Sequence, residues 1–229
     1  MTNRHISKTA DLGIKTGTNE CRVWVVGNNN TGTNLVEKLI TSQGCTPHAL
    51  DRRDTFWKHK LLRSEDLDRA KKANVDAVIV TTRHPYCWAR GMKKAPYPKD
   101  QIKRNFVGLE LGEVWNRYMH AVSEFRDSAA KNATINAEIL PYEALISDEP
   151  GYGFQSFKSV LPAARNMTQD EFDDVMASPA KKHGHPRSLA DAQLAASTQC
   201  KNELSTEEIE SLNATIDHEL AAKFGYWLL

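Results

Sequence analysis

The sequence predicts an α/β fold of three layers, in which a central parallel sheet is flanked by helices. Two short apolar runs rich in β-branched residues, 21–26 (CRVWVV) and 75–83 (VDAVIVTTR), have the composition of strands buried on both faces. Segments with helical spacing of apolar residues alternate with these runs. Such alternation is typical of a parallel sheet.

The helices and the remaining strand follow in chain order. Residues 32–42 place Leu35, Val36, Leu39 and Ile40 on one face of a helix. A long helix is predicted to begin near Leu111. Residues 132–145 predict a further strand that turns into a helix at Pro141. Residues 204–226 predict a closing helical segment, because Ser205 and Glu208 form a capping-box pair and the pattern ends near Gly225.

Length and composition indicate a single domain. The chain has 229 residues, of which 40% are hydrophobic, so it can bury one sizeable core. We expect that domain to span residues 21–229 and the polar residues 1–20 to be disordered. A net charge of +1 argues against a nucleic-acid polymer as partner. The oligomeric state is not predicted.

The compartment is predicted to be the cytoplasm. The N-terminal residues lack an apolar signal region, and no apolar run is long enough to span a membrane. Cys21, Cys45, Cys87 and Cys200 are scattered without a CxxC pair, so we expect four reduced thiols and neither a disulfide framework nor a structural zinc site.

A glycine-rich loop between the first strand and the first helix is the main candidate site. Its sequence, VVGNNNTGTN, has the G-x-x-x-x-G spacing whose backbone N–H groups and helix N-terminus bind phosphate oxygens. A nucleoside triphosphatase carries Lys and then Ser or Thr after the second glycine, whereas this chain has Thr33 and Asn34. The loop therefore retains an anion cradle but not the groups that hold a metal-bound triphosphate. The predicted binding residues are Asn28, Asn29, Asn30, Thr31, Gly32, Thr33 and Asn34.

Arg83 follows the second strand, and Pro85 follows Arg83 at a position that can begin a helix. Because ligands of parallel sheets bind at the carboxyl ends of the strands, we expect Arg83 to face the ligand of the loop. A guanidinium group suits a phosphate monoester. Pairing with a surface carboxylate is the alternative role for Arg83.

Four segments in order resemble the sulfotransferases that use 3′-phosphoadenosine 5′-phosphosulfate (PAPS). The segment VGNNNTGTNL is similar to the family's 5′-phosphosulfate loop, and TRHPYCWARGM to its 3′-phosphate segment. ILPYEALISDE is similar to its Y-E-x-L stretch, and residues 204–226 resemble its C-terminal helix. The resemblance implies the P-loop NTPase-like sulfotransferase fold, transfer of a sulfuryl group from PAPS to a hydroxyl or amine, and no metal.

Two positions depart from that family. Asn30 stands where many members have Lys or Arg, and Gly91 stands where the family has a serine that contacts the 3′-phosphate. Arg90 or a backbone N–H would then have to compensate for the serine. The resemblance also implies a Lys and a His after the first helix. Lys58 and His59 fit that order, with His59 as general base, Lys58 as the replacement cation, and His48 and Glu37 as alternative bases.

A basic segment at 178–188 is similar to a family loop that covers the nucleotide. Its candidate 3′-phosphate ligands are Lys181, Lys182 and Arg187, while His183 and His185 lack partners for a metal site. Trp57, Trp88 and Trp115 either line an acceptor or adenine pocket or pack in the core. The acceptor is expected to be a small molecule, a lipid or a saccharide. A non-catalytic nucleotide-binding module and a nucleotide-dependent, kinase-like enzyme are the alternatives.

Overall fold

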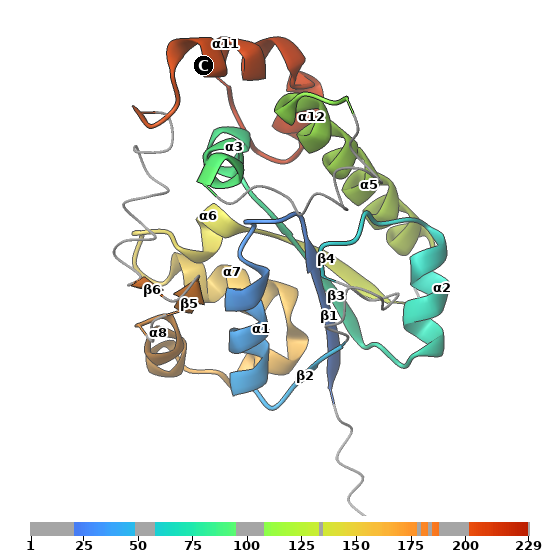
Figure 1. Ribbon diagram of the computed structural model, residues 1–229. Helices are drawn as coiled ribbons and strands as arrows, with labels where there is room; N and C mark the ends of the chain where they lie inside the picture. The colour runs from blue at the N-terminus through green and yellow to red at the C-terminus, as the bar shows by residue number, and fades with distance from the viewer. Residues whose placement is uncertain are drawn as a thin grey trace, which may run out of the picture.

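The computed structural model describes residues 21–48, 58–94, 108–132, 135–177, 180–182, 185–187 and 202–228. The prediction of disorder for residues 1–20 lies outside these ranges. Four strands form an all-parallel sheet in the order β2-β1-β3-β4 (Figure 1). They are β1 (Arg22–Gly27), β2 (Thr46–Pro47), β3 (Ala77–Thr82) and β4 (Asn136–Pro141). The predicted parallel sheet is confirmed.

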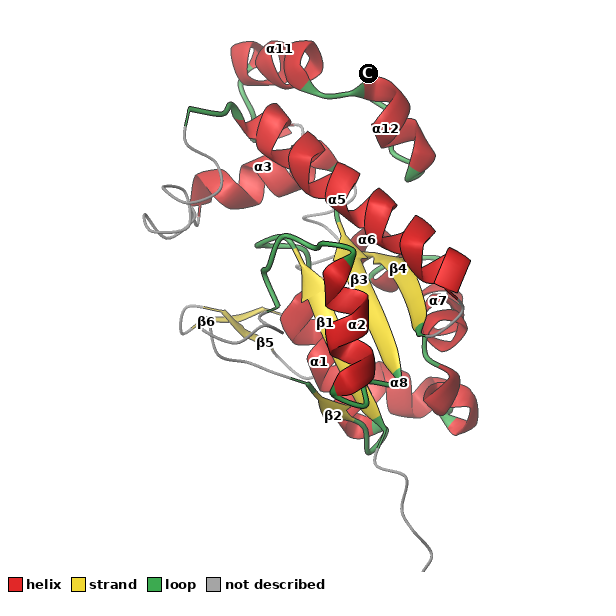
Figure 2. Ribbon diagram, turned by 90° about the vertical axis from the view of Figure 1, so that its right-hand side faces the viewer, coloured by secondary structure: helices red, strands yellow, loops and turns green. Residues whose placement is uncertain are grey.

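Helices cover both faces of this sheet, as the sequence predicted (Figure 2). Val23 and Val25 of β1 pack into one apolar cluster with α1 (Thr33–Ser42), α6 (Tyr142–Leu145), α7 (Tyr152–Val160) and α8 (Gln169–Ala177). Trp24 and Val26 pack into a second cluster with α2 (Glu65–Lys72), α3 (Pro85–Lys94), α5 (Leu111–Asn132), α11 (Thr206–Thr215) and α12 (His218–Lys223). Successive side chains of a strand point to opposite faces, so the two clusters form separate layers of core on either side of the sheet.

Three short elements complete the described part of the chain. The 3-10 helix η1 (Pro162–Asn166) follows α7, and the strands β5 (Ala180–Lys182) and β6 (His185–Arg187) form an antiparallel pair. The basic segment, which was expected to be a loop, thus contains two short strands.

The C-terminal segment differs from the single helix that the resemblance implied. The predicted capping box is present, with the Ser205 hydroxyl accepting from the Glu208 N–H. However, α11 ends at Thr215, and the Asp217 side chain accepts from the N–H of Leu220 at 2.9 Å to cap a second helix. An aspartate at this position starts a helix rather than continuing one. The helix α5 also extends to Asn132, so β4 begins at Asn136, later than predicted.

The expectation of four reduced thiols is wrong for Cys87, which is disulfide-bonded, while Cys21 and Cys45 are free. Disulfides persist mainly in oxidising compartments. Within the described ranges, none of the helices combines the length and the apolar character that a membrane crossing needs. The cytoplasmic location stays a prediction.

The C-terminal segment lies over the carboxyl ends of the strands, where α3 also begins (Figure 1). The hydroxyl groups of Thr82 and Tyr226 are 2.8 Å apart, and the Tyr86 hydroxyl donates to Asn213 Oδ1. His84 is fixed at both ring nitrogens, because Nδ1 accepts from the Tyr86 N–H at 3.3 Å and Nε2 contacts the Trp227 carbonyl oxygen at 3.2 Å. The neutral imidazole therefore links β3, α3 and the end of the chain.

We predict that acid weakens this link. Burial lowers the pKa of His84 from its ordinary value of 6.5, so the unfolded chain binds this proton more readily than the folded chain. The contribution of neutral His84 to stability is thus present above pH 6.5 and is lost as the pH falls below it. In thermal unfolding, the midpoint of the wild type should fall between pH 7 and 5 more steeply than that of His84→Gln. His120→Gln changes a more exposed histidine and serves as the control. Equal slopes of the thermal midpoint against pH for the wild type and His84→Gln would refute the prediction.

Candidate anion-binding site

The glycine-rich loop joins β1 to α1 in the way that the sequence predicted. Asn30 and Gly32 have φ of 64° and 87°, in the left-handed region that asparagine and glycine tolerate best. The N–H groups of Leu35 and Val36 donate to the Gly32 carbonyl oxygen and begin the helix. The positive end of the α1 dipole therefore lies at the loop.

Both glycines of the loop have close neighbours that leave no room for a side chain. A Cβ on Gly27 would lie 1.9 Å from Thr81 Oγ1 and 2.5 Å from Thr31 Oγ1. A Cβ on Gly32 would lie 2.3 Å from Cδ2 of Tyr142, the first residue of α6. Packing therefore requires glycine at both positions, and the left-handed backbone favours glycine at position 32 as well.

Gly32→Ala should consequently destabilise the protein by about 3 kcal/mol or more, since a left-handed alanine costs about 1–2 kcal/mol and the Tyr142 ring must also move. Gly44→Ala is the matched control, because Gly44 has φ of 71° but a Cβ there would meet no atom of the described residues within 4 Å. It should cost about 1 kcal/mol. Urea unfolding measures both values. Equal losses for the two variants would show that the contact with Tyr142 is unimportant.

The Thr31 side chain supports the loop from inside. Thr31 is 3% exposed, and its hydroxyl donates to the Asn28 carbonyl oxygen at 2.6 Å. The Thr81 hydroxyl at the end of β3 lies 2.9 Å away. The Thr31 hydroxyl proton is thus already used within the loop, and this residue shapes the cradle instead of offering its hydroxyl group to a ligand.

The Asn28 side chain is a candidate ligand donor. Asn28 is 4% exposed, and its Oδ1 accepts from the Asn29 N–H at 2.8 Å. Its Nδ2 is buried without a hydrogen-bond partner in the described part of the chain. A buried amide left without an acceptor costs about 1–3 kcal/mol. An anion held in the loop would supply such an acceptor.

Arg83 reaches the loop from the carboxyl end of β3. Its Nη1 donates to the Asn30 carbonyl oxygen at 2.9 Å, and its guanidinium carbon lies 4.9 Å from the centre of the Tyr142 ring. The side chain is 12% exposed, and Nε lies 4.0 Å from Glu143 Oε1. The structure thus brings together the two parts of the site that the sequence predicted on separate strands.

The two positions that depart from the sulfotransferase pattern pack against each other. A Cβ on Gly91 of α3 would lie 3.1 Å from the Asn30 Cβ and 3.6 Å from Arg83 Nη1. The Asn30 Nδ2 also contacts the Met92 sulfur at 3.3 Å. Asn30 and Gly91 therefore form one compact contact beside Arg83, and the small size of each suits the other. The Arg90 guanidinium group pairs with Glu203, and the compensating role considered for Arg90 stays a prediction.

Glu143 is a site residue that the sequence analysis did not single out. Its Oε1 accepts from the His84 N–H at 3.0 Å, while Oε2 is buried with no partner among the described residues. Burial raises the pKa of Glu143, and the nearby Arg83 partly offsets this rise. The signal in the sequence was the position of Glu143 two residues after the end of β4, at the same edge of the sheet where Arg83 follows β3.

Lys58 and His59 also lie at the loop. The Lys58 carbonyl oxygen accepts from the Gly27 N–H at 2.7 Å, and Lys58 Nζ donates to Asn34 Oδ1 and Glu37 Oε2. The His59 Nδ1 lies 2.9 Å from the Gly27 carbonyl oxygen. Because a carbonyl oxygen only accepts, Nδ1 carries the proton and the lone pair of the neutral ring is on Nε2. This is the tautomer that a general base requires.

The alternative bases are less suitable. Glu37 pairs with Lys58 at 2.8 Å. The N–H of His48 donates to the carbonyl oxygen of Val23, four residues before Gly27, which places His48 about 13 Å along the sheet from the loop.

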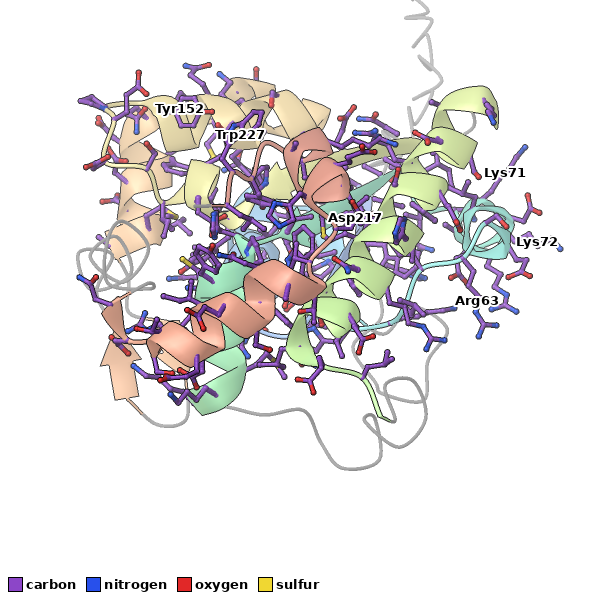
Figure 3. The ribbon with its side chains drawn as sticks, turned by 90° about the horizontal axis from the view of Figure 1, so that it is seen from above. Arg63, Lys71, Lys72, Tyr152, Asp217 and Trp227 are labelled. Atoms are coloured by element: carbon purple, nitrogen blue, oxygen red, sulfur yellow. The ribbon has the colours of Figure 1, made fainter. Side chains whose placement is uncertain are left out.

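A buried carboxylate anchors the segment that carries Lys58 and His59. Asp66 is 0% exposed and accepts from the Arg63 N–H at 3.1 Å, and it forms ion pairs with Lys60 and Arg69. The exposed side of this region carries further basic side chains, among them Arg63, Lys71 and Lys72 (Figure 3). The Asp66 contacts tie Lys60 and Arg63, which follow His59 closely in the chain, to the start of α2.

The basic residues of the 178–188 segment and the three tryptophans are the remaining predicted site residues. Lys181 and Lys182 lie in β5 and Arg187 in β6, and their side chains fall outside the described part of the structure, as does Trp57. Trp88 and Trp115 are 1% and 2% exposed in the core, so they do not line an open pocket. The Trp115 Nε1 donates to the Arg83 carbonyl oxygen at 3.1 Å and thereby helps to fix the backbone at Arg83.

Comparisons with protein-family models, with curated proteins and with solved structures found no match to this chain.

Proposed function

We propose that the protein is a PAPS-dependent sulfotransferase. The observation that carries this proposal is the meeting of Arg83, Lys58 and His59 at a glycine-rich loop without the lysine of a triphosphatase. A 5′-phosphosulfate is an anion that needs no magnesium. The loop N–H groups, the start of α1 and the Asn28 amide suit such an anion.

Sulfuryl transfer breaks the bond between sulfur and the bridging phosphate oxygen and forms a bond from sulfur to the acceptor oxygen or nitrogen. Negative charge develops on the bridging oxygen, where backbone N–H donors and the Lys58 ammonium group would stabilise it. The Nε2 of His59 would take the proton of the acceptor. Lys58 would have to turn toward the ligand from its contacts with Asn34 and Glu37, which lie in the first half of α1.

In this proposal, Arg83 binds the 3′-phosphate beside Gly91, and Lys181 and Lys182 complete the nucleotide site. The acceptor is a hydroxyl or amine of a small molecule, a lipid or a saccharide, and it enters beside Lys58 and His59. No metal takes part in the proposed reaction. The cytoplasm is the proposed location.

A non-catalytic nucleotide-binding module is the second candidate. The residues Asn30 and Gly91 support it, because the sulfotransferases that the sequence resembles have a cation and a hydroxyl group where this chain has a neutral amide and no side chain. A kinase-like enzyme has less support, since Thr33 and Asn34 follow the second glycine in place of a lysine and a magnesium ligand.

Turnover of PAPS separates these candidates. The protein would be incubated with PAPS, EDTA and panels of phenol, sugar, amine and lipid acceptors, while formation of adenosine 3′,5′-bisphosphate is followed. Acceptor-dependent formation of the bisphosphate in the presence of EDTA supports the enzyme. Tight binding of the bisphosphate without turnover for any panel would favour the binding module, and magnesium-dependent use of ATP would favour the kinase.

A further inference from the structure

Two free thiols lie opposite each other where β1 and β2 begin. Arg22 pairs with Thr46 in the parallel register, and the Thr46 N–H donates to the Cys21 carbonyl oxygen at 2.7 Å. One residue earlier, Cys21 faces Cys45. Neighbouring strands lie about 4.7–4.9 Å apart, within the range of about 4.4–6.8 Å that the Cα atoms of a disulfide span.

The two side chains lie at the same apolar cluster and differ in their access to solvent. Cys45 is 3% exposed, and Cys21 is partly exposed and packs against that cluster. Burial, followed by the contact with Cys21 and the charge of Asp76, raises the pKa of Cys45 to about 12. Cys21 is therefore the thiol that reacts first with a reagent in solution, because thiolate character and access control reactivity.

We propose that Cys21 and Cys45 form a redox site, in which oxidation by a small-molecule disulfide joins them and ties β2 to β1. The Cys21 thiolate attacks one sulfur of the oxidant and releases one small thiolate, which leaves a mixed disulfide. Cys45 then loses its proton to solvent and attacks the Cys21 sulfur, which releases the second small thiol. Two electrons pass from the protein to the oxidant, whose S–S bond is replaced by that of the protein.

The bond would act on a weak part of the sheet. β2 contains only Thr46 and Pro47, and the Thr46 and His48 N–H groups hold it to β1. A covalent link at Cys45 would fix the point where the chain leaves α1 and joins the sheet. This proposal does not depend on the sulfotransferase function.

Glutathione disulfide, added to the folded full-length chain, tests the proposal by peptide mass spectrometry. We expect a linked pair of peptides containing Cys21 and Cys45, lighter by two hydrogen atoms than the two reduced peptides together. The thermal midpoint of the oxidised chain should rise by about 5–10 °C, because the link constrains the unfolded state. A linked pair that forms only in denaturant, or no link at all, would overturn the proposal.

Single variants separate the two steps. Cys45→Ser should keep a stable glutathione adduct on Cys21, since no second thiol can displace it. Cys21→Ser should leave Cys45 unmodified while the protein stays folded. A stable adduct on Cys21 in the wild type, without a link to Cys45, would contradict the pairing even if neither variant folds.

Discussion

Arg83→Ala is expected to weaken the binding of adenosine 3′,5′-bisphosphate by about 100-fold, or ~2.7 kcal/mol. The change removes the charged group that lies at the loop and also its hydrogen bond to the Asn30 carbonyl oxygen. It also takes away the charge that partly offsets the effect of burial on the pKa of Glu143, so that carboxyl group would be protonated more readily and would not replace the lost attraction for a phosphate. Calorimetric titration measures the loss.

Two further variants show whether this loss arises from the site. Arg83→Lys keeps the charge but not the planar fork, so it should lose about 10-fold. Arg63→Ala removes one positive charge from an exposed position near α2 and should leave the affinity unchanged (Figure 3). An Arg83→Ala variant that folds and binds the bisphosphate like the wild type would remove Arg83 from the site.

His59→Ala should lower the rate of sulfuryl transfer by about 10²- to 10⁴-fold, the usual contribution of a general base, while the affinity for the bisphosphate changes little. The separation is expected because His59 Nδ1 lies 2.9 Å from the Gly27 carbonyl oxygen, which leaves the lone pair of the neutral ring on Nε2 to accept the proton of the acceptor. Single-turnover kinetics with PAPS measures the chemical step without product release.

His48→Ala is the control for that variant, because His48 is the alternative base and lies away from the loop. It should transfer at the wild-type rate. If His48→Ala loses activity and His59→Ala does not, the base has been assigned to the wrong histidine. If both retain full activity, neither His48 nor His59 is the general base.

The fold was predictable because buried parallel strands leave a strong pattern. The runs that became β1 and β3 are almost wholly apolar, and every residue of β3 is buried. β2 gave no such pattern, since it has only two residues and is held by backbone hydrogen bonds. α2 was not predicted either, because only Leu67 and Ala70 supply its apolar contacts and most of its other residues are charged.

The site was predictable in part for the same reason. The carboxyl ends of neighbouring parallel strands meet at one edge, so Arg83 after β3 had to lie near the loop after β1. The sequence could not show that Asn30 and Gly91 touch, because that contact depends on how α3 packs. It also could not show that the Thr31 hydroxyl turns inward to Asn28 and Thr81. Glu143 was not singled out, because its hydrogen bond to the His84 N–H depends on how α6 packs beside the start of α3.

The most direct test of the central claim is a calorimetric titration with adenosine 3′,5′-bisphosphate, run beside ATP with magnesium. The proposed site predicts tight binding of the bisphosphate with EDTA present and weak or no binding of ATP with magnesium. Binding of ATP with magnesium alone would contradict the proposal and indicate a kinase-like enzyme. Binding of neither nucleotide would show that the loop at Asn28–Asn34 does not form a nucleotide site.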